Sequence, residues 1–161
     1  MDICVPSNFN RTRITRISRI YHDINYMNKK FIIFTDGGAR GNPGPAATGI
    51  VIKDEKGKTI AHYGEYLGDQ TNNYAEYMAL ISGLKKAQAL GADEVDCMLD
   101  SELVVKQLQR KYKVKEPTLQ KLFILAYNAS AQFKKVTYKH IPRERNKEAD
   151  AEVNLVLDGR A

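Results

Sequence analysis

Four acidic residues stand where folding could bring their side chains to one point. Asp36 follows one buried strand pattern, and Asp100 ends another. Glu76 and Asp150 each lie in the first turn of a predicted helix. Carboxylates without histidine or thiol suit Mg²⁺ or Mn²⁺ better than Zn²⁺, and two such ions about 4 Å apart can activate water and stabilise the leaving oxygen of a phosphodiester. Because four carboxylates packed without cations would repel one another, their convergence would predict a two-metal site.

Each of these acids also has a local structural explanation. Asp36 could simply open an Asp-Gly turn. Glu76 could complete a capping box, and Asp100 could cap the helix that follows it. Asp150 could interact favourably with the dipole of its own helix. A metal site explains all four positions at once, whereas the local explanations are independent of one another.

The stretch around Asp36 combines a strand pattern with unusual glycine content. Residues Phe31 to Thr35 are typical of a buried strand, and the glycines from Gly37 to Gly44 predict a turn. Backbone amides in such a turn can approach a ligand closely because glycine has no side chain.

The hydrophobic periodicity predicts five strands and four helices. The predicted strands cover residues 31–35, 46–53, 58–67, 95–99 and 134–140, and the predicted helices cover 73–91, 101–110, 117–129 and 146–157, the last capped by Asn146. Short connections make the first three strands an antiparallel meander, whereas helices separate the last two. The fold class is therefore α/β, a mixed five-stranded sheet with strands 1–3 antiparallel, strands 4 and 5 parallel, and helices on both faces.

Length and charge restrict the class of protein. A chain of 161 residues with 43% hydrophobic residues accommodates one well-formed core. No apolar run is long enough to span a membrane and no secretory signal is recognisable, so we expect a cytoplasmic protein that does not contact a membrane. The net charge of +6 favours a polyanionic partner. We expect a monomer without an obligate protein partner.

The first 28 residues differ in character from the rest of the chain. Arginines alternate with isoleucines between Arg11 and Ile20, with few acidic residues. This basic extension could be an arm for nucleic acid or lipid, or a targeting presequence, but a disordered leader without specific function is the stronger interpretation. The predicted domain then covers residues 29–161.

Six different short motifs follow one another along this domain. They are Thr35-Asp36-Gly37-Gly38, Gly41-Asn42-Pro43-Gly44, Thr71-Asn72-Asn73-Tyr74-Ala75-Glu76, Leu99-Asp100-Ser101, His140-Ile141-Pro142-Arg143-Glu144 and Asn146-Lys147-Glu148-Ala149-Asp150. In this combination the chain resembles type 1 ribonuclease H, in its short form without a basic handle, from residue 31 to about 157. The resemblance implies a ribonuclease H-like fold and a metal-dependent endonuclease that cuts the RNA strand of RNA/DNA hybrids, leaving 3′-hydroxyl and 5′-phosphate ends.

The resemblance also implies roles for the four acids with two Mg²⁺ ions, for which Mn²⁺ can substitute. Asp36 would bridge both ions, and Asp150 would help hold the ion that activates water. Glu76 and Asp100 would hold the ion on the leaving-group side.

A histidine and an arginine are candidates for assisting turnover. His140 stands ten residues before Asp150, as does a mobile histidine in many members of the family, and its ordinary pKa suits proton transfer near neutral pH. It could instead be a strand-end histidine bonded to its surroundings. Arg143, in the same loop, could then replace it.

Substrate contacts are likewise implied by the resemblance. The residues concerned are Gly37, Gly38, Asn42, Thr71, Asn72, Asn73 and Ser101. Amide side chains can recognise the 2′-hydroxyl that distinguishes RNA from DNA, and Thr71 corresponds to a DNA-phosphate contact. Helix capping or turn chemistry explains Asn73 equally well.

The chain departs from the family pattern at the DNA-binding positions. Tyr74 and Asp69 stand where many members carry basic residues, and a short connector with Lys111, Lys113 and Lys115 replaces the handle. Two other functions therefore stay open: additional cleavage of double-stranded RNA, or a nucleic-acid-binding module without catalysis.

Overall fold

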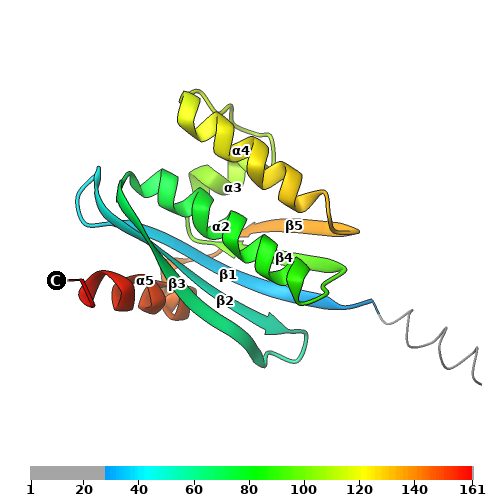
Figure 1. Ribbon diagram of the computed structural model, residues 1–161. Coiled ribbons are helices and arrows are strands. Elements are labelled where there is room, and N and C mark those ends of the chain that lie inside the picture. Colours follow the sequence, from blue (N-terminus) through cyan, green and yellow to red (C-terminus); the bar gives the residue numbers. More distant parts are fainter. Residues whose placement is uncertain (1–27, 161) are drawn as a thin grey trace, which may run out of the picture.

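The computed structural model describes residues 28–160 (Figure 1). Residues 1–27, and with them nearly all of the predicted basic extension, lie outside this described part. The elements in chain order are β1 (Lys30–Ala39), β2 (Gly44–Asp54), β3 (Thr59–Gln70), α2 (Asn72–Ala89), β4 (Glu94–Leu99), α3 (Glu102–Leu108), α4 (Pro117–Ser130), β5 (Lys135–His140), a 3₁₀ turn (Arg143–Arg145) and α5 (Lys147–Asp158).

The strands form one mixed sheet in the order β3-β2-β1-β4-β5. The pairs β1–β2 and β2–β3 are antiparallel, whereas β1–β4 and β4–β5 are parallel. Helices α2, α3 and α4 lie on one side of the sheet and α5 on the other (Figure 1). The predicted fold class is confirmed.

Two apolar clusters hold the helices to the sheet. The larger one joins α2, α3 and α4 to the inner face of the strands, with Ile33, Ile50 and Leu80 fully buried. The smaller one joins α5 to β2 through Val153 and Ala47. Because β2 contributes to both clusters and pairs with β1, the two helical layers have fixed positions relative to β1.

The strand β1 is longer than the sequence predicts. It continues through Asp36 to Ala39, and Asp36 pairs with Gly49 on β2. The interpretation of Asp36 as the opening of an Asp-Gly turn is therefore wrong. Gly37 is required within the strand because a Cβ atom there would lie 2.1 Å from the backbone carbonyl carbon of Ala75, at the start of α2.

The helix caps also differ from two predictions. Thr71 caps α2 by accepting a hydrogen bond from the Tyr74 amide, and Ser101 caps α3 by accepting one from the Val104 amide. Neither Glu76 nor Asp100 acts as a cap, so their local explanations are wrong. Asn146 precedes α5 as predicted, but its side chain makes no capping hydrogen bond.

No helix within residues 28–160 combines the length and apolar character required to cross a bilayer.

Candidate active site

Three carboxylates converge where β1, α2 and β4 meet. One carboxylate oxygen from each of Asp36, Glu76 and Asp100 lies within 4.8 Å of the others. The convergence follows from the fold: Thr35 on β1 is in register with Leu99 on the parallel neighbour β4, so the residues after them lie side by side. Gly37 lets the start of α2 approach β1, because a Cβ atom there would collide with the backbone of Ala75 and Glu76.

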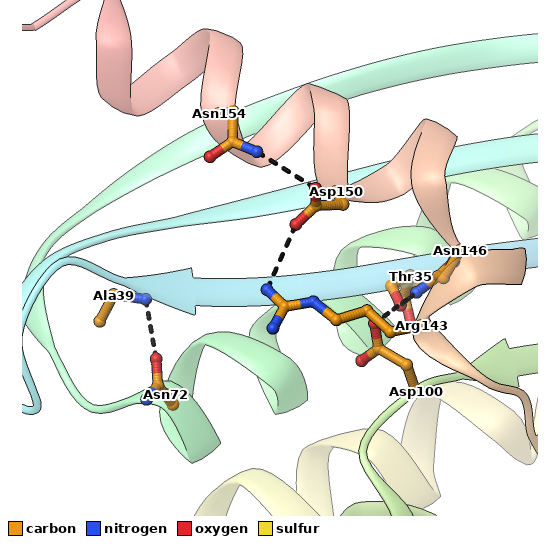
Figure 2. A network of polar contacts seen from close by, with 8 residues as sticks. All are labelled: Thr35, Ala39, Asn72, Asp100, Arg143, Asn146, Asp150 and Asn154. Atoms are coloured by element: carbon orange, nitrogen blue, oxygen red, sulfur yellow. Dashed lines mark hydrogen bonds and ion pairs between the residues drawn. The ribbon is translucent and has the colours of Figure 1, made fainter.

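The fourth acid approaches from the opposite side of the sheet. Asp150, in the first turn of α5, lines the same cavity of about 500 Å³ as the other three acids. Its Oδ1 atom lies 3.5 Å from the Arg143 guanidinium, and its Oδ2 accepts a hydrogen bond from Asn154 (Figure 2). Asp150 is therefore held by an arginine in this structure and lies outside the tight cluster of three.

Burial and mutual repulsion disfavour negative charge in the cluster. The side chains of Asp36 and Glu76 are almost fully buried. Burial, followed by the charges of Asp100 and Asp150, raises the pKa of Asp36 to about 7, although the positive charge of Arg143 acts in the opposite direction. Burial, followed by the charges of Asp36 and Asp100, raises the pKa of Glu76 well above its usual range.

The cluster fits a hard divalent cation. All its candidate ligands are carboxylate oxygens, and the buried Oε2 atom of Glu76 has no hydrogen-bond partner within the described part of the chain. An unpaired buried carboxylate oxygen is costly unless a cation or water binds it. Mg²⁺ and Mn²⁺ prefer such oxygen ligands.

The two candidates for assisting turnover occupy different positions. The Nε2 atom of His140 lies 3.1 Å from the backbone carbonyl oxygen of Asp100, and His140 does not line the cavity. Arg143 does line it, with its guanidinium exposed beside Asp150. Of these two residues, Arg143 is therefore the one whose positive charge lies at the cavity.

The residues expected to contact substrate divide into two groups. Gly37, Gly38, Asn72 and Ser101 line the cavity, whereas Asn42, Thr71 and Asn73 do not. Asn42 still belongs to the same framework, because its Oδ1 accepts a hydrogen bond from the Asn72 amide. Asn72 in turn accepts one from the Ala39 amide, which ties the end of β1 to the start of α2 (Figure 2).

The sequence analysis gave no role in the site to two polar residues of the cavity or to one residue that supports it. Arg40 and Asn154 line the cavity, and Asn146 contacts Asp100 from behind it. Arg40 also forms an ion pair with Asp158 at the end of α5. Only Asn154 carries a signal that could have been read from the sequence, since it lies one helical turn after Asp150.

Comparison of the sequence and the structure with known proteins identifies the class to which this fold and acid cluster belong. Residues 34–156 match the family model described as Reverse transcriptase-like. The structure is similar to that of RNase H1 from the archaeon Halobacterium salinarum, with a TM-score of 0.79, 38% identity, and coverage of 81% of this chain and 98% of that one. The chain belongs to the type 1 ribonuclease H family.

Two further relatives extend this comparison. LC11-RNase H1, isolated from compost and solved in complex with an RNA/DNA hybrid, is 48% identical with a TM-score of 0.77, covering 81% of this chain and 98% of that one. A bifunctional protein of Mycobacterium tuberculosis is 44% identical over 133 residues, 82% of this chain and 36% of that protein. The chain thus spans little more than a third of the length of the first curated relatives it matches.

Proposed function

We propose that this protein is an endoribonuclease that hydrolyses the RNA strand of RNA/DNA hybrids with two Mg²⁺ ions, for which Mn²⁺ can substitute. The observation that carries this proposal is the convergence of Asp36, Glu76 and Asp100 in one cavity with Asp150. The hybrid bound by the related LC11 enzyme supports the same substrate class here.

The four acids would share the two cations. Asp36, central in the cluster, would contact both, Asp150 would hold the one beside the attacking water, and Glu76 with Asp100 would hold the other. Bound cations would lower the pKa of that water and neutralise charge on the leaving 3′ oxygen, which gives 3′-hydroxyl and 5′-phosphate products. The acids lie on β1, directly after β4 and on two helices, and their fixed positions would orient the scissile phosphate for in-line attack.

Substrate discrimination would come from the framework at the end of β1. Backbone near Gly37 and Gly38, with the side chains of Asn42, Asn72 and Asn73, would contact the RNA 2′-hydroxyls across the shallow minor groove. Ser101 would also contact the RNA strand. Thr71 would contact a phosphate of the DNA strand. Since Asn42 and Asn72 are already joined by a hydrogen bond, they would act as one preorganised unit.

Arg143 rather than His140 would face the substrate phosphate during turnover, because only Arg143 lines the cavity. We expect Arg143→Ala to lower kcat by about 10²-fold, the scale on which loss of one charge-stabilising group acts. His140→Ala should lower kcat less. A larger loss in His140→Ala would instead assign the assisting role to the histidine, and single-turnover rates of the two variants at neutral pH measure the difference.

A gel assay with labelled duplexes tests the proposal. RNA/DNA, RNA/RNA and DNA/DNA duplexes are incubated with Mg²⁺, Mn²⁺ or a chelator. We expect cleavage of the RNA strand of the hybrid alone, with either cation and not with chelator. Cleavage of RNA/RNA would show the broader substrate range, and binding without any cleavage would show a module without catalysis and overturn the proposal. The monomeric state and the cytoplasmic location stay predictions.

A further inference from the structure

A buried asparagine connects the elements that carry the acids. Asn146 lies between the 3₁₀ turn and α5, and only 1% of its surface is exposed. Its Nδ2 group donates one hydrogen bond to the backbone carbonyl oxygen of Thr35, at 2.8 Å, and another to Oδ2 of Asp100, at 3.2 Å (Figure 2). Thr35 immediately precedes Asp36, so one amide group contacts both β1 and the acid that follows β4.

The orientation of this amide is determined by its partners. A carbonyl and a carboxylate only accept hydrogen bonds, so the amide nitrogen, and not Oδ1, must face them. The Oδ1 atom is buried without a hydrogen-bond partner within the described residues. Burying an acceptor without a partner is costly, so an asparagine that merely filled this space would be unfavourable. The two hydrogen bonds that its amide donates therefore explain why asparagine occupies this position.

The backbone of the same residue reaches the fourth acid. The carbonyl oxygen of Asn146 accepts a hydrogen bond from the amide of Asp150, at 3.0 Å, in the first turn of α5. Asn146 therefore links β1 beside Asp36, the carboxylate of Asp100 and the turn that carries Asp150.

We propose that Asn146 is a positioning residue for the metal site: its amide holds one oxygen of Asp100 and leaves the other for a cation, while it fixes the start of α5 against β1. This inference rests on the proposed function for the identity of the cations. Aspartate at this position would place an acceptor against two acceptors, and alanine would leave the Asp100 carboxylate free to rotate. Both changes would leave the acids present but no longer preorganised.

Mn²⁺ affinity without nucleic acid is the test, measured by titration calorimetry on the wild type and on Asn146→Ala. Mutation of a residue that hydrogen-bonds to a metal ligand typically lowers metal affinity by about 10–100-fold, and we expect a loss of at least about 10-fold in Asn146→Ala. Asn146→Ser keeps a shorter O–H donor, so we expect it to lose less Mn²⁺ affinity than Asn146→Ala. If Asn146→Ala does not fold, Asn146→Ser replaces it in the comparison. An affinity within about 2-fold of the wild type in a folded variant would overturn the proposal.

Gln107→Ala is the matched control. Gln107 is also a buried amide, but it accepts a hydrogen bond from the Tyr77 hydroxyl on α2 and does not line the cavity. We expect this control to lower the thermal midpoint and leave Mn²⁺ affinity unchanged. If Gln107→Ala lost as much Mn²⁺ affinity as Asn146→Ala, general destabilisation would explain the loss in both variants. That result would overturn the proposal. A wild type that binds Mn²⁺ yet cleaves no hybrid would contradict the proposed function and leave this inference intact.

Discussion

The variant Asp36→Asn is expected to cleave RNA/DNA hybrid at least about 10³-fold more slowly than the wild type, at or beyond the upper end of losses seen on removal of one transition-state-stabilising group. Asp36 interacts with each of Glu76, Asp100 and Asp150, and by our proposal it would contact both cations. Asparagine has nearly the same shape and retains the backbone pairing with Gly49, but it supplies one neutral oxygen in place of a charged pair. The rate under single-turnover conditions with saturating Mg²⁺ measures the effect.

Folding is not expected to suffer in this variant. The charge removed is a buried one, and its neighbours Asp100 and Asp150 repel it. We therefore expect a thermal midpoint at least equal to that of the wild type above neutral pH, so the loss of rate would not be a loss of structure.

Asp96→Asn provides a comparison on the neighbouring strand. Asp96 lies on β4, forms an ion pair with Lys30 and accepts a hydrogen bond from Thr137. It does not line the cavity, so this variant should keep its activity. Wild-type activity in Asp36→Asn would contradict the assignment of the site, whatever Asp96→Asn does.

The position of the acids could be predicted where strand order determined it. Once β1 and β4 are recognised as parallel neighbours, the residues that follow matched positions must meet, and Asp36 and Asp100 do so. Glu76 could be placed near the start of α2, although the helix begins at Asn72 and Glu76 therefore lies just beyond the first turn that the sequence predicts for it. These predictions depend only on periodicity and on the direction of the strands.

Two features could not be predicted because tertiary contacts override local preference. The glycines after Asp36 indicate a turn by composition, but they continue the strand because α2 packs against the backbone of Gly37. Asn146 has the sequence context of a helix cap, yet its amide turns inward to Thr35 and Asp100, which are distant in the chain. In both cases a residue that the sequence assigns to local structure serves the site instead.

Without divalent cation, the protein is expected to become less stable as the pH rises from about 4 to about 7. The folded state holds a proton on Asp36 until its pKa of about 7, whereas the unfolded chain releases that proton near 3.8. The folded state therefore binds more protons across this interval, and the free energy of unfolding falls with rising pH. The contribution of this group is at most about 4 kcal/mol, since each pKa unit corresponds to about 1.4 kcal/mol. Glu76, whose pKa is also raised, acts in the same direction.

Mg²⁺ should reverse this trend, because a bound cation stabilises the deprotonated carboxylates that burial disfavours. Thermal midpoints measured across the interval should fall with pH in a chelator and fall less, or rise, with excess Mg²⁺. Asp36→Asn has no proton to release at this position, so its chelator curve should be flatter than that of the wild type. Parallel curves for the two proteins would show that Asp36 ionises in the folded state near its ordinary pKa. The cluster would then tolerate its charges without a cation, and the repulsion from which a metal site is inferred would be too weak to require one.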